Sequence, residues 1–234
     1  MSNKRDINSI VLPRRDENGH YRISYSQFDS WKAVSSFNLK VYGNIEYMAA
    51  YFFGDKFPDA GWAQFGTEVE GYITEREFSD KFAPAEKQTM DPIIPLGVFQ
   101  HEVKLYLLPN VYILGYIDDM APDMSKIRDY KTCSTNSKAK YYKESYYQLD
   151  IYGMYVQQLT GKIPEGEVCA VERKGNVMGL ENARHLLSVG KSVWYIPRVF
   201  TQERFDTVKA DLIKFIYDLS DHYKLYLKLN GKGL

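Results

Sequence analysis

Three charged side chains near the middle of the chain have types and spacing that could do chemistry together. Asp118 ends the β-rich segment 111–118, and Asp129 and Lys131 lie two residues apart in the segment 126–132. Successive side chains of a strand point to opposite faces, so Asp129 and Lys131 share a face. If the two segments pair as a hairpin, Asp118 and Asp129 converge near one end of a sheet.

Two converging carboxylates repel each other unless a cation lies between them, and hard oxygen ligands suit Mg²⁺, with Mn²⁺ as the alternative. A metal of this kind lowers the pKa of its bound water and so supplies a nucleophile for a phosphodiester. A neighbouring lysine such as Lys131 could neutralise charge that develops on the phosphate oxygens. The same Asp-x-Lys pattern also occurs in surface ion pairs, which contribute little.

The segment 139–160 is predicted to be a helix with further candidate side chains. Gln148 and Tyr152 are four residues apart, which places them on one helical face. Six tyrosines also fall between positions 141 and 155. Most of these rings are expected to pack under the sheet with their hydroxyls at the rim, and stacking on nucleic-acid bases is the alternative. Gln148 could equally be a solvated helix residue.

The charges of the chain balance overall, with Lys+Arg 30 and Asp+Glu 30. Polyanion binding therefore requires a local excess of positive charge. The segment 126–143 has six basic residues against one acid, whereas 54–91 has nine acids against four bases. We expect Lys138, Lys140 and Lys143 to contact DNA beside the Asp129–Lys131 pair. Solvated faces that average out are the competing interpretation.

These side chains are positioned by an expected alternation of helices and strands. A short helix capped by Ser24 or Ser26 runs through Trp31, and helices follow at 44–53 and 61–78. The second of these has a predicted buried stripe of Trp62, Phe65, Val69 and Ile73. Strands are predicted at 98–108, 111–118, 126–132, 167–174 and 192–199, with Pro109-Asn110 as the turn between the first two. A long amphipathic helix from about Thr201, with Val208, Leu212, Phe215 and Leu219 on one face, ends the pattern.

This pattern predicts an α/β fold, a central mixed β-sheet flanked by helices, in a single domain over 1–234 with a motif core of about 60–160. An apolar fraction of 44% and a charged fraction of 26% exclude a disordered or fibrous chain. No apolar run reaches the roughly 20 residues of a membrane span, and no signal peptide precedes the pattern, so a cytoplasmic location is expected. Two cysteines and four scattered histidines argue against zinc and iron–sulfur sites.

The order of the motifs resembles that of the PD-(D/E)XK nuclease superfamily, in its RecB-like and phage-exonuclease branch. The motifs are Gly66-Thr67-Glu68-Val69-Glu70, Gly115-Tyr116-Ile117-Asp118, Asp129-Tyr130-Lys131 and Gln148-x-x-x-Tyr152, preceded by the segment ISYSQFDSW. The resemblance covers about 22–160 and implies a restriction-endonuclease-like core with N-terminal helices and a long C-terminal helix.

The resemblance also implies roles for individual residues. Asp118, Asp129 and the backbone carbonyl of Tyr130 would be metal ligands, and Lys131 would be the catalytic lysine. Gln148 and Tyr152 would help to place Lys131 and the DNA backbone. Glu70 stands where many RecB-like members have a histidine ligand, and a site made of oxygen ligands leans further towards Mg²⁺.

The neighbouring Glu68 is the competitor of Glu70 for this role, because both glutamates flank the buried stripe about equally. Gly66 favours Glu70, since it leaves that flank bare for a strand, a metal or a phosphate. Glu68 has the like-charged Glu75 on its flank, which suits solvent. Glu102 is a further candidate, either an accessory acid near the metal or a surface residue.

We therefore expect a Mg²⁺- or Mn²⁺-dependent deoxyribonuclease, an exonuclease that serves DNA recombination or repair as in phage systems. The first alternative is a restriction-like or structure-specific endonuclease. An alternative of another class is a non-catalytic DNA-binding subunit that keeps the fold. Expected partners are DNA, a single-strand annealing or recombination protein, and further copies of this chain.

Overall fold

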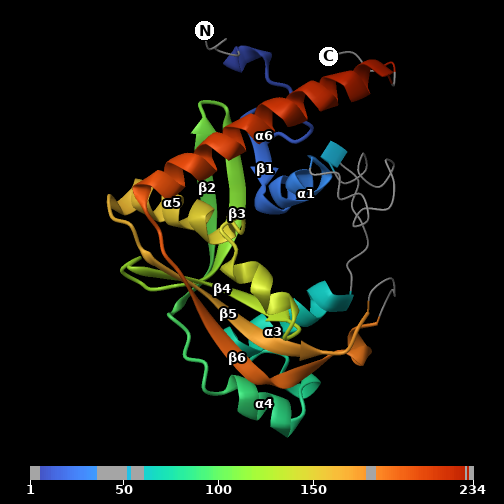
Figure 1. Ribbon diagram of the computed structural model, residues 1–234, viewed down its shortest axis with the longest axis vertical. Helices are drawn as coiled ribbons and strands as arrows, with labels where there is room; N and C mark the ends of the chain where they lie inside the picture. The colour runs from blue at the N-terminus through green and yellow to red at the C-terminus, as the bar shows by residue number, and fades with distance from the viewer. Residues whose placement is uncertain (1–5, 36–51, 54–60, 178–182, 230, 232–234) are drawn as a thin grey trace. The chain divides into compact units, whose positions relative to one another are not determined.

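The computed structural model describes residues 6–35, 52–53, 61–177, 183–229 and 231 (Figure 1). Its six strands are β1 (Tyr21–Ser24), β2 (Val98–Leu108), β3 (Val111–Met120), β4 (Lys126–Cys133), β5 (Glu165–Lys174) and β6 (Ser188–Arg198). They form one sheet in the order β1-β3-β4-β5-β6, with β2 paired to β3. The pairs β1–β3 and β4–β5 are parallel, whereas β3–β4 and β5–β6 are antiparallel. The prediction of an α/β fold with a mixed sheet is confirmed.

The helices of the described residues are α1 (Tyr25–Ser35), α3 (Gly61–Glu75), α4 (Pro84–Met90), α5 (Gln148–Thr160) and α6 (Gln202–Leu229). Short 3₁₀ helices are η1 (Ile7–Ser9), η3 (Ser79–Lys81), η4 (Ser137–Tyr142) and η5 (Arg184–Leu186). The chain divides into two compact units, one of 1–57, 103–115 and 202–234 and one of 58–102 and 116–201. Strands β2 and β3 contribute to both units. The single domain over 1–234 stays a prediction.

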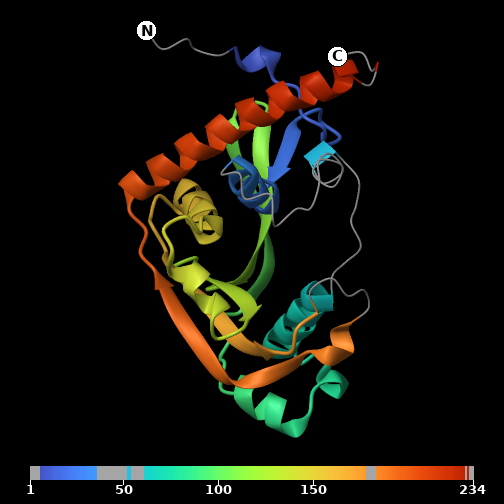
Figure 2. The same ribbon diagram turned by 45° about the vertical axis from the view of Figure 1, so that its right-hand side comes forward.

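In the first unit, β1 and α1 pack with the long helix α6, which is drawn in red beside them in Figures 1 and 2. The hydroxyl of Ser24 accepts a hydrogen bond from the amide of Gln27 at 3.3 Å, so Ser24 caps α1 as predicted. The rings of Phe28 and Phe215 meet edge to face at 5.5 Å. The predicted stripe of α6, formed by Val208, Leu212, Phe215 and Leu219, is buried.

In the second unit, helices cover both faces of β4 and β5. Residues of α3 and α4 form one core with Tyr130, Cys169 and Val171 of the two strands. Asp129 and Lys131 alternate with Tyr130 and therefore point to the opposite face, where α5 packs. Helix α4 lies alongside β6 in both views (Figures 1 and 2). The face shared with α5 is called the site face below.

Three helix predictions need correction or lie outside the structure. The helix expected over 61–78 ends at Glu75, because Arg76 and Phe78 adopt left-handed φ values of 60° and 54°. Trp62 is 54% exposed, so its place in the buried stripe was wrong. The helix expected over 44–53 falls outside the described residues, except for its last two positions.

The helix expected over 139–160 is divided into η4 and α5, and the residues between them are not helical. The cause is Arg198. Its guanidinium donates hydrogen bonds to the backbone carbonyl oxygens of Lys143, Glu144 and Tyr146. Carbonyls that are bonded to Arg198 do not need helical partners, so the chain turns here before α5 begins. Lys138 and Lys140 therefore lie in η4 and Lys143 directly after it, not on an α-helix.

Candidate active site

The β3–β4 hairpin brings the predicted acidic residues to one place. Asp119 is opposite Arg128 in the antiparallel register, and the amide of Tyr130 donates to Oδ2 of Asp118 at 2.8 Å. The Nζ atom of Lys131 lies 2.6 Å from Oδ2 of Asp129 and 3.9 Å from Oδ2 of Asp118. It also donates to the backbone carbonyl of Tyr130 at 3.1 Å. The predicted convergence of the two aspartates is confirmed, with the lysine between them.

The start of α5 adds a chain of polar side chains to Asp129. The hydroxyl of Tyr146 lies 2.9 Å from Oδ2 of Asp129 and 2.9 Å from Oε1 of Gln148. The amide of Gln148 in turn donates to the hydroxyl of Tyr152 at 3.2 Å. Burial raises the pKa of Tyr152, and the charge of Asp129 raises it further. Gln148 and Tyr152 thus share one helical face as predicted, and that face points to the aspartate.

Tyr146 was not among the predicted site residues. Its position follows from the turn before α5, which Arg198 fixes. Nη2 of Arg198 lies 2.7 Å from the carbonyl oxygen of Tyr146 and 2.8 Å from Oδ2 of Asp150, a carboxylate with no exposed surface. No periodicity in the sequence marks these contacts, because Arg198 reaches the carbonyl of Tyr146 by one long-range hydrogen bond and Asp150 by one long-range ion pair.

Glu70 reaches the same region from α3. Its carboxylate accepts a hydrogen bond from the side chain of Gln100, a residue with a left-handed φ of 48°. Burial raises the pKa of Glu70, and the charges of Asp129 and Asp119 add to this while Lys131 opposes it. A Cβ built on Gly66 would lie 3.9 Å from Oγ1 of Thr132, so the bare flank does face β4, with room for a methyl group.

Glu68 does not face solvent, so that part of the sequence interpretation was wrong. Its side chain is buried and forms an ion pair with Arg184 of η5, and it accepts a hydrogen bond from Gln64 at 3.1 Å. The sequence hid this partner because Arg184 is 116 residues away in the chain. The two glutamates are therefore distinguished by their partners: Glu68 has an arginine, and Glu70 has a neutral amide.

The electrostatics of the site show an excess of carboxylates. Burial raises the pKa of Asp118 well above its usual range, and the charges of Asp129 and Glu70 raise it further. Burial alone would lower the pKa of Lys131, but Asp129 and Asp118 outweigh this and raise it. Lys131 therefore stays charged, while its single positive charge does not compensate the three acids around it.

The donor set was tested for its fit to a metal ion. Among the described residues, no three side chains of His, Cys, Asp or Glu are close enough to hold a metal as they stand. However, Oδ1 of the fully buried Asp129 has no hydrogen-bond partner in this part of the chain. A buried carboxylate oxygen without a partner is costly. Oxygen donors from Asp118, Asp129, the Tyr130 carbonyl and Glu70 fit the preferences of Mg²⁺ and Mn²⁺.

The opposite face of β4 holds a second group of buried charges, which sequence reasoning missed. The carboxylate of Asp119 accepts hydrogen bonds from the amides of Leu96 at 2.8 Å and Gly97 at 3.1 Å, and from the hydroxyl of Tyr130 at 2.8 Å. Arg128 lies 3.4 Å from Asp119 and 2.6 Å from Glu167. This group fixes the backbone of β3 and β4 directly behind the site.

Three of the six basic residues of segment 126–143 already have carboxylate partners. Lys126 and Arg128 pair with Glu167, and Lys131 pairs with Asp129. The remaining three are the predicted DNA-contacting lysines, Lys138, Lys140 and Lys143. Nζ of Lys138 lies 4.4 Å from the ring centroid of Trp194, and Nζ of Lys140 lies 4.8 Å from that of Tyr141. Glu102 was the candidate accessory acid. Its carboxylate accepts a hydrogen bond from the hydroxyl of the exposed Tyr116 at 3.4 Å, and this contact assigns it no role at a metal.

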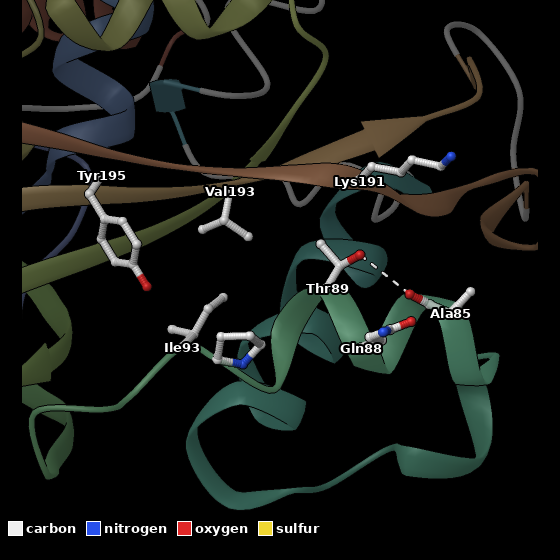
Figure 3. A pocket seen from close by; sticks show the side chains of 8 residues that line it. Ala85, Gln88, Thr89, Ile93, Lys191, Val193 and Tyr195 are labelled. Atoms are coloured by element: carbon white, nitrogen blue, oxygen red, sulfur yellow. Dashed lines mark hydrogen bonds between the residues drawn. The ribbon is translucent and has the colours of Figure 1, made fainter.

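A pocket of about 580 Å³ lies between α4 and β6, on the face opposite the site. Figure 3 shows its lining, which includes Thr89 of α4, Ile93, and Lys191, Val193 and Tyr195 of β6. Thr89 donates to the carbonyl of Ala85 at 3.3 Å, a bond within its own helix. None of the predicted site residues lines this pocket, and its side chains include no carboxylate.

The chain was compared with protein-family models, with curated proteins and with solved structures. No family model matches the chain, and no curated protein matches it. One solved structure that does match is a candidate exonuclease from Eubacterium rectale, with 14% sequence identity, 85% of each chain covered and a TM-score of 0.45. A likeness of this size does not by itself establish a shared function. None of the described helices has the length and apolar character that a membrane crossing requires.

Proposed function

We propose that the chain is a metal-dependent deoxyribonuclease of the PD-(D/E)XK type, with its active site on the site face of β3 and β4. The observation that carries the proposal is Asp129. This carboxylate is fully buried and is held by Lys131 and the Tyr146 hydroxyl through Oδ2, while Oδ1 has no partner among the described residues. An acid that is oriented so firmly and yet left incomplete is typical of a functional site.

In this proposal, Asp118, Asp129, the Tyr130 carbonyl and Glu70 hold Mg²⁺, or Mn²⁺ as the alternative. The bound metal supplies an acidified water and stabilises negative charge on the phosphate. The Lys131 ammonium, which Asp129 and Asp118 keep protonated, neutralises charge that develops on the phosphate oxygens.

The residues around α5 orient these groups. Tyr146, Gln148 and Tyr152 form one hydrogen-bonded chain that ends on Oδ2 of Asp129. This hydrogen-bonded series fixes the rotamer of Asp129 through Oδ2 and leaves Oδ1 without a partner among the described residues. Lys138, Lys140 and Lys143, beyond Tyr141, are proposed to contact the DNA backbone, since backbone phosphates attract lysines without regard to sequence.

Within this class we favour an exonuclease for recombination or repair, as in the RecB-like and phage branch, acting with an annealing or recombination protein or with further copies of the chain. A restriction-like or structure-specific endonuclease is the alternative. A non-catalytic DNA-binding subunit is disfavoured, because such a protein has no need to keep Lys131 charged between two acids.

Incubation with linear and with covalently closed circular DNA, with and without Mg²⁺, tests the proposal. The wild type should degrade linear DNA in Mg²⁺ and leave the closed circle intact. Cleavage of both substrates would identify an endonuclease. Lys131→Met should lose most of its activity. Lys126→Met, which removes a lysine of the same strand that pairs with Glu167, should retain activity. A wild type that binds DNA but cleaves neither substrate in Mg²⁺ or Mn²⁺ would overturn the proposal.

A further inference from the structure

The segment between β4 and α5 places aromatic rings among lysines on the site face. Lys131 is in register with Ala170 of β5, and Ala170 is in register with Trp194 of β6. Side chains in register on neighbouring strands point to the same face. With strands about 4.8 Å apart, the backbone of Trp194 lies about 10 Å from that of Lys131. Trp194 therefore belongs to the surface that continues from the proposed active site.

A direct contact confirms this placement. Nζ of Lys138 in η4 lies 4.4 Å from the ring centroid of the half-buried Trp194, so η4 lies over the same face. η4 is in turn anchored to the active site by Tyr141, which is buried and meets the ring of Tyr146 edge to face at 5.2 Å. Tyr146 is the residue whose hydroxyl contacts Asp129.

The next residue of η4 points outwards. Tyr142 is 59% exposed, in contrast to the buried Tyr141, and it lies between Lys140 and Lys143 in the sequence. Large exposed aromatic rings among basic side chains are a common feature of surfaces that bind single-stranded nucleic acid. The lysines contact phosphates, while the rings stack on bases of any sequence.

A second lysine of η4 also lies beside an aromatic ring. Nζ of Lys140 lies 4.8 Å from the ring centroid of the buried Tyr141. Two cations beside the exposed ring of Tyr142 are suited to a chain of phosphates with accessible bases.

We propose that η4, with Tyr142 and the neighbouring Trp194, binds the unpaired strand of a nucleic-acid substrate by base stacking, while Lys138 and Lys140 contact its phosphates. An intact duplex does not fit this role, because its bases are stacked on each other and expose only their edges in the grooves. At a rise of 3.4 Å per nucleotide, Trp194 would lie about three nucleotides from the cleaved bond. The inference rests on the proposed function and specifies the form of its substrate.

The position of η4 is built firmly enough for this role. Oγ1 of Thr135 donates to Glu172 at 3.3 Å, and the same carboxylate accepts the amides of Lys191 at 2.8 Å and Ser192 at 3.1 Å. Glu172 therefore ties the residues before η4 to the first half of β6, the strand that carries Trp194. The lysines and rings are presented by a fixed backbone, which lowers the ordering cost of binding.

The test measures binding in metal-free buffer by fluorescence anisotropy, with labelled oligothymidylate, oligouridylate and a duplex of the same length as probes. Tyr142→Ser should weaken both single strands about tenfold, which lies within the range for loss of one base–aromatic stack, and should change duplex binding little. Tyr195→Ser is the matched control. Tyr195 is 48% exposed, and it lies next to Trp194 in β6 but points to the opposite face of the sheet. It should leave all three affinities unchanged.

Trp194→Phe provides a second readout with a ring that preserves packing. Oligothymidylate should quench the tryptophan fluorescence of the wild type, and this quenching should be much smaller in Trp194→Phe. Equal weakening of single-strand and duplex binding by Tyr142→Ser, or an effect of Tyr195→Ser of the same size, would overturn the inference. Because no metal is present, these outcomes leave the cleavage test of the proposed function standing on its own.

Discussion

The two faces of β4 each hold buried charged side chains, but only one of these groups is complete. On the face towards α3, both oxygens of Asp119 have partners, and Arg128 is shared between Asp119 and Glu167. On the site face, Asp118 and Asp129 flank one lysine, Glu70 of α3 adds a third carboxylate to their electrostatics, and Oδ1 of Asp129 has no partner among the described residues.

The difference separates a group of charges that stabilises the fold from a group that, in the proposed function, binds a metal ion. A complete group holds the fold because each polar atom exchanges its water for a protein partner. An incomplete group with raised carboxylate pKa values is held against its own repulsion, which is the usual condition of a site that awaits a ligand. Substitutions on the two faces should therefore differ in kind: loss of stability on one, loss of activity on the other.

The largest expected effect is on stability. Arg128→Met leaves the buried Asp119 without its cation and should lower the free energy of unfolding by about 3–5 kcal/mol, measured by urea denaturation. The matched control is Lys126→Met, whose partner is also Glu167 but whose side chain is 30% exposed, and which should cost under about 1 kcal/mol. Equal losses in the two variants would contradict the structural role of the Asp119 group.

On the site face, Lys131→Met should lower the rate of DNA cleavage by about 100- to 1,000-fold, because the ammonium that stabilises charge on the phosphate is lost. Unlike Arg128→Met, it should still bind DNA in metal-free buffer, since the lysines of η4 remain. Steady-state cleavage and anisotropy measured on the same preparation separate the two effects. A variant that cleaves at the wild-type rate would remove Lys131 from the active site.

Glu70 and Glu68 provide a comparison within a single helix. Glu70→Gln should raise the Mg²⁺ concentration needed for half-maximal cleavage and lower the maximal rate. Glu68→Gln should leave both quantities unchanged but lower the free energy of unfolding by about 1–3 kcal/mol, because it leaves the partly buried Arg184 without its carboxylate. A metal titration and a urea titration of both variants decide between them. The assignment fails if Glu68→Gln has the larger effect on metal dependence.

A smaller effect is expected from Asp118→Asn in the absence of metal. Its carboxyl has a folded-state pKa raised by burial and by Asp129, so the ionised form costs stability above that pKa, and the cost disappears as the pH falls through it. The variant should therefore unfold at a higher urea concentration than wild type at pH 8, with a shrinking difference at lower pH. A variant that is less stable than wild type at pH 8 would show that the ionised Asp118 carboxylate does not destabilise the folded protein.

Much of this site could be predicted from local sequence, because hairpin pairing and strand alternation are local rules. They placed Asp118, Asp129 and Lys131 together, and helical spacing placed Gln148 beside Tyr152. What failed depends on single long-range contacts. Arg198 interrupts the helix expected over 139–160, and Arg184 pairs with a buried Glu68 where the like-charged Glu75 had indicated solvent.

The Asp119 group was missed for a related reason. A run of two aspartates in sequence places one on each face of the strand, and only the fold shows that the second meets Arg128 and the backbone of residues 96–97. Periodicity identifies the face of a side chain but not its partner, so the complete and the incomplete groups look alike in the sequence.

The central claim is that the incomplete carboxylates of the site face form a metal-dependent active site. The most direct test is the initial rate of linear DNA cleavage as a function of Mg²⁺ concentration, for wild type and Asp129→Asn. Asparagine keeps the shape of the side chain and its contact with Tyr146 but removes the charge. The account predicts a saturable Mg²⁺ dependence for wild type and a rate about 100-fold lower for Asp129→Asn at every concentration. Equal rates for the two proteins, or a wild-type rate that does not depend on the metal, would contradict it.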